Sequence, residues 1–508
     1  MRKLTNFLIA ATIGLAMVAC KSEEVPPVDN TKGNTYASLE IGYAPMKSPV
    51  TKSTRAVTET SFEGTAVERA VNKVTVFGEA TATANREFTN PVQKAANIWT
   101  VPAWQTTAGS RPFGLAINLA TAPAVNLASE TATDGAKLTG PITAYVSDNG
   151  NPGITMSSTV VKTQMINAGV SEAQANSGTT AADNVVEFDM KRVVAKAAVR
   201  AAGTSINVTN GDGGATLGAF STLTFAPTNL SKESFLFQKL GANNDVYQPS
   251  NVDTYMLPAT ATEVGANASN YARLGDADLS ALVAPGATAY HPYKAVEMNS
   301  TTDPIADIEG NYFFENIERA LFWGNVTYMK VYGTYTPAVT EIQQLNSAGD
   351  ALENPTTFAA GTTFYKGAID GKLYVTKEAA QFAVAGQQVY MYKNGRMGYR
   401  VLVYQDPADA NFQDSGTGAN PVTNADVLRN YFYILDITAI QGLGFNYDGN
   451  DPNDPNLPKP TNGENPDEPT VPEDGVTPDM PINTKDTYMR VQATILPWTV
   501  VSRDVILK

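Results

Sequence analysis

Residues 185–200 read VVEFDMKRVVAKAAVR, and this stretch carries most weight for the fold class. Val193, Ala197 and Arg200 are three and four positions apart, so the second half is also compatible with a helix. The many β-branched valines favour one long strand instead. Similar strand signals recur at 71–77, 111–119, 326–335, 388–392, 399–404 and 431–437. The sequence therefore predicts a mostly β protein, with residues 160–175 as one of few helical candidates.

The composition excludes several classes of protein. The chain has 508 residues, 43% of them hydrophobic and 17% charged, which indicates a globular protein of more than one domain. Its formal charge of −14 argues against nucleic-acid binding, because neutralising phosphates needs clustered cations. A single cysteine and a single histidine exclude an internal disulfide framework and a metal site built on cysteines or on several histidines. We therefore expect no cofactor.

The first twenty residues are typical of an export signal. Two cations precede an apolar stretch, residues 7–19, that is too short to span a membrane comfortably. The stretch ends in Met-Val-Ala-Cys, which resembles a bacterial lipobox with cleavage between Ala19 and Cys20 and diacylation of Cys20. The acyl chains would hold the precursor at a membrane. An ordinary signal peptide that happens to contain a cysteine is the alternative.

A short strand is predicted after the export signal. In residues 36–43 (YASLEIGY) the side chains of Ala37, Leu39, Ile41 and Tyr43 recur at every second position, as in a half-buried strand. The strand is followed by a loose basic segment of small polar residues without apolar periodicity. Within that segment the bond between Arg55 and Ala56 has the character of a cleavage site.

The chain ends in a polar linker and a last strand. Residues 448–479 hold nine acidic residues and eight prolines without an apolar period, which indicates an extended, self-repelling linker. Asp448, Asp451 and Asp454 could suggest a calcium loop, but the terminal glutamate of an EF-hand is missing. The strand that follows has one apolar face, made by Met489, Val491, Ala493 and Ile495, and runs on to Trp498. Such a tethered strand needs a partner, because its backbone and apolar face are otherwise exposed.

These features together resemble the fimbrillins of Bacteroidales type V pili, most of all the subunit that forms the shaft of the short (minor) fimbriae. The resemblance rests on the lipobox, the strand before Arg55, residues 187–200, and the acidic linker before residues 488–508. The Pro-Trp-Thr at 497–499 is its most specific part. Residues 324–328 and 429–437 also fit, so the similarity covers most of the chain.

The resemblance implies two tandem transthyretin-like β-sandwich domains with short helices. The expected segments are a signal peptide (1–19), a propeptide with the first strand (20–55), an N-terminal domain (56–240), a C-terminal domain (241–447), the linker (448–480) and a C-terminal donor strand (481–508). The boundary near residue 240 rests on the turn-forming residues 240–244, after an apolar Phe-Leu-Phe.

The resemblance also implies a function. The precursor would be a lipoprotein of the outer membrane, and an Arg-specific protease would cut after Arg55. Loss of the first strand would open a groove lined by apolar residues, and the last strand of another subunit would fill it. The result would be a cell-surface fimbria that supports adhesion and biofilm formation, with anchor and tip subunits as further partners.

Two other classes of function are alternatives to a fimbrial subunit. A surface glycan-binding lipoprotein would keep its N-terminal anchor and stay monomeric. Its sugar-stacking platform could use tryptophans, but core packing is the more usual role of Trp99, Trp104, Trp323 and Trp498. A secreted hydrolase has no residues to support it, because the only histidine, His291, lacks a nucleophilic partner, and no carboxylate pair has a known distance. We therefore predict a protein that is not an enzyme.

Overall fold

The computed structural model describes residues 35–43, 64–79, 81–95, 98–129, 136–146, 153–158, 161–178, 181–201, 203, 205–210, 214–237, 271–272, 294–298, 309–316, 324, 326–403, 427–446, 489–490 and 499–507. These residues form a mostly β protein, as the sequence predicts. The described α-helices are α1 (Glu172–Ser177) and α4 (Lys377–Ala383), beside 3-10 turns at Leu127–Ser129, Ile142–Ala144, Ala181–Asp183 and Lys393–Gly395. Within the described residues, no helix has the length and apolar character needed to cross a membrane.

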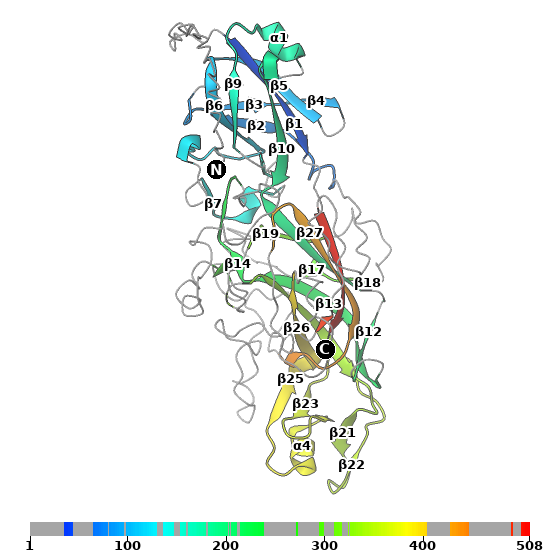
Figure 1. Ribbon diagram of the computed structural model, residues 1–508. Coiled ribbons are helices and arrows are strands. Elements are labelled where there is room, and N and C mark those ends of the chain that lie inside the picture. Colours follow the sequence, from blue (N-terminus) through cyan, green and yellow to red (C-terminus); the bar gives the residue numbers. More distant parts are fainter. Residues whose placement is uncertain are drawn as a thin grey trace, which may run out of the picture.

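Three larger sheets follow one another along an elongated molecule (Figure 1). The first has nine strands in the order β3-β2-β6-β8-β10-β1-β5-β4, and β9 pairs with β6. Its strands are β1 (Thr35–Tyr43), β2 (Lys73–Phe77), β3 (Asn85–Thr89), β4 (Val92–Ala95), β5 (Ile98–Thr106), β6 (Gly109–Ile117), β8 (Met156–Ser158), β9 (Lys162–Ile166) and β10 (Val185–Arg192).

The second sheet has twelve strands, with the main order β18-β11-β27-β12-β13-β20-β26-β28. Its strands are β11 (Val194–Ala201), β12 (Ile206–Thr209), β13 (Thr216–Thr228), β17 (Lys294–Ala295), β18 (Glu297–Met298), β19 (Asn311–Phe314), β20 (Tyr328–Pro337), β26 (Arg396–Leu402), β27 (Tyr431–Ile440), β28 (Phe445–Asn446), β29 (Met489–Arg490) and β30 (Thr499–Leu507). Its largest contacts are antiparallel β13–β20 and the parallel pairs that β27 makes with β11 and β30.

A third sheet of five strands lies at the opposite end of the molecule from the first, next to α4 (Figure 1). It has the order β22-β21-β24-β23-β25. Its strands are β21 (Ile342–Leu345), β22 (Leu352–Glu353), β23 (Phe364–Gly367), β24 (Leu373–Tyr374) and β25 (Val389–Tyr392). Two short pairs complete the described strands, namely β14 (Leu230–Ser231) with β16 (Tyr271–Ala272), and β15 (Glu233–Phe235) with β7 (Lys137–Thr139).

The long strand predicted over 185–200 is two strands in two different sheets. The chain bends at buried Val193, whose N–H donates to the carbonyl of Thr155 at 3.1 Å. Before the bend, β10 alternates buried and exposed residues, whereas all eight residues of β11 are buried. The helical alternative is wrong for β11, because its backbone pairs with β27 and β19. The change of sheet at Val193 lies inside the predicted domain 56–240. The predicted domain boundary at residue 240 stays a prediction.

Two local sequence predictions are wrong. Residues 160–175 were expected to be helical, but they form β9 and only the start of α1. Residues 393–396 (Lys-Asn-Gly-Arg) have a turn sequence that favours a hairpin between the predicted strands 388–392 and 399–404. Instead β25 pairs with β23, and β26 pairs with β20 and β28, so the turn connects two sheets. Gly395 allows this connection, because its φ is +68° and a Cβ there would lie 2.5 Å from a backbone oxygen of β20.

Candidate functional site

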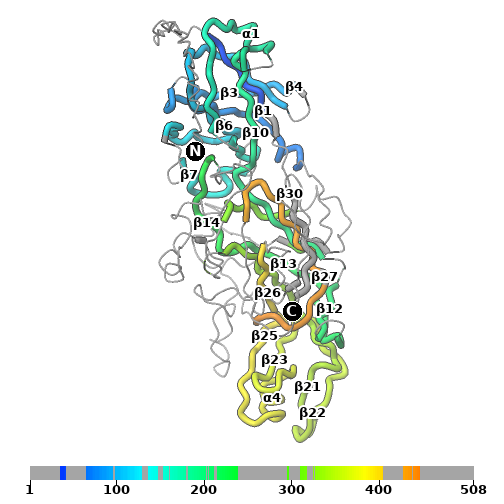
Figure 2. Tube along the Cα trace, viewed as in Figure 1, coloured from blue at the N-terminus to red at the C-terminus, as the bar shows by residue number. Residues whose placement is uncertain are grey.

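Strand β1 lies in the interior of the first sheet, as the trace in Figure 2 shows. It runs parallel to β10 and antiparallel to β5. Ala37, Leu39 and Ile41 have at most 1% of their surface exposed and belong to the core of this sheet. Tyr43 is the last residue of the strand, and its side chain lies outside the described part. The predicted strand is therefore present with a buried apolar face, while its removal during processing stays a prediction.

The side chains of two tryptophans on β5 contribute to the same core. Trp104 lies opposite Ala37, and Trp99 lies opposite Ile41. Both side chains are buried, with 2% and 9% of their surface exposed. Core packing, which the sequence favours over a sugar-binding surface, is confirmed for these two. Trp323 and Trp498 lie outside the described residues.

A buried hydroxyl holds the start of β1. Thr35 Oγ1 donates to the carbonyl of Asn167 at 2.6 Å, and it accepts from the Val170 N–H and from Asn184 Nδ2, each at 3.1 Å. Asn184 Nδ2 also donates to the carbonyl of Tyr36 at 3.0 Å. Thr35 and Asn184 are fully buried, and Asn184 adopts a left-handed conformation with φ +57°. Asparagine is among the residues that tolerate this conformation, so the network is a specific local arrangement.

Helix α1 covers the other face of β1. Ser38 Oγ donates to the carbonyl of Ala175 in this helix at 2.7 Å. Opposite Ser38, β5 has a bulge at Pro102 and Ala103, where two residues face one. The proline has no N–H, and the Ala103 N–H donates to Asn176 Oδ1 of α1 at 2.8 Å. Strand β1 is therefore bound on both edges and on both faces.

The chain that follows the predicted cleavage site is attached separately through Glu68. The Glu68 carboxylate accepts from Lys196 Nζ at 3.1 Å and from the Tyr312 hydroxyl at 2.7 Å, and its second oxygen accepts from the Thr65 N–H at 2.7 Å. The Glu68 carbonyl accepts from Arg192 Nη2 at 3.3 Å. Lys196 and Tyr312 belong to the second sheet, so this contact links the two sheets without using β1. No sequence pattern marks Glu68 as a buried anchor.

The charge of Glu68 is stabilised by these partners. Burial by itself raises the pKa of the carboxyl group, but Lys196, the hydroxyl of Tyr312 and the N–H of Thr65 outweigh this effect. The pKa of Glu68 therefore lies below its ordinary value. A carboxyl group with a lowered pKa stabilises the fold above its unfolded-state pKa, and the stabilisation is lost as the pH falls through the lowered pKa.

Replacing Glu68 by glutamine is expected to lower the free energy of unfolding at neutral pH by about 1.5–3 kcal/mol, because Lys196 loses its charged partner. The variant should also lose less stability than the wild type on acidification, since the titrating group is gone. Urea unfolding at pH 7 and pH 4 measures both effects. The matched control is Glu87→Gln, because the Glu87 side chain is 43% exposed and its partner Lys73 is partly exposed. Equal stability of the Glu68 variant and the wild type at pH 7 would contradict the anchoring role.

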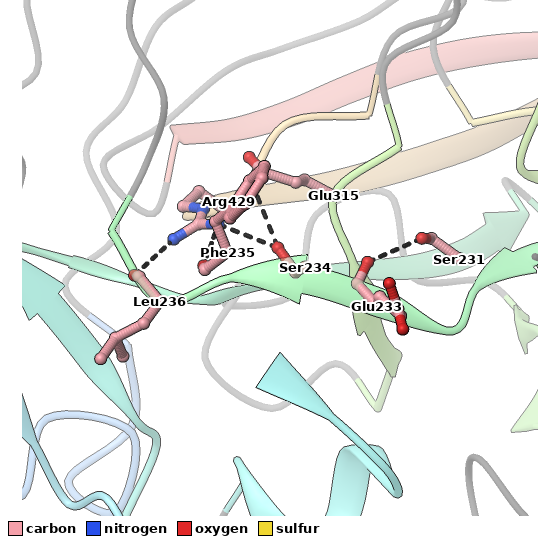
Figure 3. Close-up of polar contacts among 7 residues, drawn as sticks. All are labelled: Ser231, Glu233, Ser234, Phe235, Leu236, Glu315 and Arg429. Atoms are coloured by element: carbon pink, nitrogen blue, oxygen red, sulfur yellow. Dashed lines mark hydrogen bonds and ion pairs between the residues drawn. The ribbon is translucent and has the colours of Figure 1, made fainter. Parts of the chain in front are cut away.

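A second buried ion pair lies beside the ends of β19 and β27 and contacts residues of β15 (Figure 3). Arg429 precedes β27 and pairs with Glu315, and both side chains are at most 3% exposed. Arg429 also donates to the Ser234 hydroxyl at 2.9 Å and to the carbonyls of Phe235 and Leu236 at 2.6 and 3.0 Å. Ser234 and Phe235 belong to β15, which pairs with β7. This arginine therefore connects the start of β27 to the β7–β15 strand pair. In the sequence, only the family resemblance of residues 429–437 draws attention to Arg429, and no pattern predicts that its side chain is buried.

The ends of the chain are described only in part. Cys20, Arg55 and Ala56 lie outside the described residues, as do Val491, Ala493 and Ile495 of the predicted donor strand. Met489 belongs to the two-residue strand β29, which pairs with β30. Strand β30 runs parallel to β27 along nine register pairs. In the full-length chain the residues after Trp498 therefore form a strand that lies against β27.

The C-terminal part of the chain matches a known family. Residues 390–504 fit the family model of the fimbrillin C-terminal region, from the major fimbrial subunit protein type IV. The matched range begins in β25 and includes β26, β27 and Arg429, so it covers the C-terminal part of the second sheet. This match shows that the C-terminal part of the chain, residues 390–504, is similar to fimbrillins.

Solved structures of fimbrial proteins are also similar to this chain. A fimbrilin from Porphyromonas gingivalis W83 is 14% identical, with 94% of this chain and 98% of that one covered and a TM-score of 0.39. The C-terminally truncated tip fimbrial protein of Porphyromonas gingivalis is 13% identical, with 80% and 95% covered and a TM-score of 0.29.

Proposed function

We propose that this protein is a structural subunit of a cell-surface fimbria, that it is cut after Arg55, and that it polymerises by donor-strand exchange. The observation that carries the proposal is the position of β1. It precedes Arg55 in the chain, yet it forms an interior strand between β10 and β5. A cut after Arg55 would leave β1 attached only by noncovalent contacts, while Glu68 would still hold the processed chain to the second sheet.

Loss of β1 would leave a groove that is costly to expose. The backbone groups of β10 and β5 that face β1 would lose their partners, and an unpaired buried N–H or C=O is unfavourable. Burial of Leu39 and Ile41 alone contributes roughly 3–6 kcal/mol, and this stabilisation would be lost as well. A strand from another subunit would restore both the backbone hydrogen bonds and the burial of apolar side chains, as in β-augmentation.

The C-terminal tail, residues 487–498, supplies a suitable donor. Its apolar residues Met489, Val491, Ala493 and Ile495 alternate as the core-facing residues of β1 do. In the full-length chain β29 and β30 lie on the second sheet, so the tail would leave this position during assembly. The donor and the groove belong to opposite parts of the subunit. Contacts of this head-to-tail kind need not close into a ring, and they produce open filaments.

The remaining parts of the proposal follow from the family resemblance. The precursor reaches the outer membrane as a lipoprotein through Cys20, and an Arg-specific protease releases it from the propeptide. The filament supports adhesion and biofilm formation together with anchor and tip subunits. The protein is a structural subunit without catalytic activity.

The substitution Arg55→Ala tests the proposal. The wild-type precursor, incubated with an Arg-specific protease, is expected to form a ladder of oligomers on SDS gels without boiling, and boiling should convert it to monomer. The Arg55→Ala precursor is expected to stay monomeric, because β1 remains covalently attached. N-terminal mass spectrometry of the processed wild type should start at Ala56.

The substitution Arg86→Ala is a matched control, since it removes a half-exposed arginine from β3 without changing the predicted cleavage site. It should leave the ladder unchanged. A wild-type chain that is cut after Arg55 and remains monomeric at high concentration would overturn the proposal.

A further inference from the structure

The tail and β1 share more than their apolar alternation. Residues 35–41 read Thr-Tyr-Ala-Ser-Leu-Glu-Ile, and residues 487–493 read Thr-Tyr-Met-Arg-Val-Gln-Ala. In this alignment the first two residues are identical, Gln492 corresponds to Glu40, and the three apolar positions coincide. The match is directional, because it aligns the two segments from N-terminus to C-terminus.

The apolar positions alone do not determine how far the tail enters the groove. Side chains alternate with period two, so a slip of two residues would again place apolar side chains in the core. It would also place Met489 or Lys485 at the position of Thr35. The register therefore needs a contact that recognises one residue type at one position.

The site around Thr35 has this property. Its hydroxyl donates to one carbonyl, that of Asn167, and accepts from the Val170 N–H and from Asn184 Nδ2. Among uncharged aliphatic side chains only serine and threonine can do both at one oxygen. Removal of Thr35 would leave the buried N–H of Val170 and the buried amide of Asn184 without this acceptor, and methionine or lysine would not replace it. Asn184 is itself held in place, because its Oδ1 accepts from the Asn167 N–H at 2.7 Å.

We propose that the tail of one subunit enters the groove of the next in a single register, with Thr487 in the place of Thr35 and the chain running parallel to β10. This inference rests on the proposed donor-strand exchange and adds its direction and register. Val491 then replaces Leu39 between Val101 and Val186, and Ala493 replaces Ile41. Met489 takes the place of Ala37, where its unbranched side chain can adapt to the space beside Trp104.

Cysteine pairs can measure the register directly. The chain processed after Arg55 has no cysteine, because the single cysteine of the sequence is Cys20. Glu40 lies opposite Thr100 of β5, so the proposed register places Gln492 of the neighbouring subunit opposite Thr100. Directly opposite residues have Cβ atoms about 4.5–5.5 Å apart and diagonal ones are farther, which favours a disulfide only for the former.

The double variant Thr100→Cys with Gln492→Cys is therefore expected to form covalent polymers on boiled, non-reducing gels. Thr100→Cys with Arg490→Cys, and Thr100→Cys with Thr494→Cys, represent slips of two residues and should form noncovalent polymers with at least about tenfold less cross-linking. Preferential cross-linking in either of these two would overturn the register, and so would polymers without cross-links in any pair. Absence of polymers in all three variants and in the wild type would overturn donor-strand exchange itself.

The hydroxyl is tested by Thr487→Val, which keeps the shape of the side chain. We expect its polymers to dissociate about tenfold faster or more in SDS at a fixed temperature, because the buried N–H of Val170 loses its acceptor. Thr487→Ser should restore the wild-type rate. The matched control is Thr494→Val, which makes the same change at the position that corresponds to Gly42 and should have no effect. Equal dissociation of the Thr487→Val and wild-type polymers would overturn the role of the hydroxyl.

Discussion

Replacing Arg429 by methionine is expected to lower the free energy of unfolding by about 3–5 kcal/mol. Methionine is unbranched and has no charge, so Glu315 would remain as a buried carboxylate without its ion-pair partner. The carbonyls of Phe235 and Leu236 would lose a donor as well. This loss is a large part of the stability of an ordinary domain. Urea unfolding followed by circular dichroism measures it.

A matched control lies on the β7–β15 strand pair, which Arg429 contacts through Ser234 and Phe235. Lys137 on β7 pairs with Glu233 on β15, and both side chains are more than 40% exposed. The substitution Lys137→Met removes a cation of similar length, but water can solvate the remaining carboxylate. We expect a change of at most about 1 kcal/mol. Equal effects of Arg429→Met and Lys137→Met would show that burial of the Arg429–Glu315 pair has no energetic consequence.

Deleting residues 487–508 is expected to abolish polymerisation completely while the subunit still folds. The groove vacated by β1 would then have no donor, because no other part of the chain has been assigned to fill it. The fold should persist, since the residues whose burial is described already form large cores in the first and second sheets, and all of them precede the tail. The measurement is an SDS gel without boiling after treatment with the Arg-specific protease, with circular dichroism of the monomer alongside.

The contrasting truncation removes residues 499–508 and keeps the predicted donor residues. It deletes β30 and exposes an edge of β27, but it leaves Met489 to Trp498 in the chain. We expect this shorter chain to polymerise. If both truncations stopped polymerisation, the donor would include β30, and if neither did, the donor role of the tail would be wrong.

Much of the strand content was predictable because the signal is local. The alternation of Ala37, Leu39 and Ile41 predicts β1 and its buried face, and the apolar runs at 71–77 and 431–437 contain β2 and the first part of β27. A strand places successive side chains on opposite faces, so a few neighbouring residues are enough to reveal it. The same local reasoning placed Trp99 and Trp104 in a core.

The failures came where neighbours in sequence belong to different sheets. Val193 has the β-branched character of its surroundings, and nothing local indicates that β10 and β11 separate there. The turn at Lys393–Gly395 has the residues of a hairpin, yet its two flanking strands pair elsewhere. A turn sequence favours a backbone conformation, and it does not choose the partners of the strands on either side.

The buried charges were unpredictable for the same reason. Arg200 lies opposite Asp436 on β27, with hydrogen bonds of 2.5 and 2.7 Å, although 236 positions separate them in the chain. Glu68 and Lys196 are 128 positions apart. A charged residue in an apolar stretch is more often exposed than buried, so its sequence surroundings do not reveal a distant partner.

The amino-acid sequence determined on its own that this protein is mostly β, which segments form many of its strands, and which side chains of β1 face a core. These properties depend on residues within a few positions of one another. Which strands flank β1, which residues satisfy the hydroxyl of Thr35, and which cation neutralises Glu68 were decided by the folded chain. The contacts of Thr35 with Asn184 and of Glu68 with Lys196 join residues more than a hundred positions apart, and their free energy depends on burial that exists only once the sheets have formed.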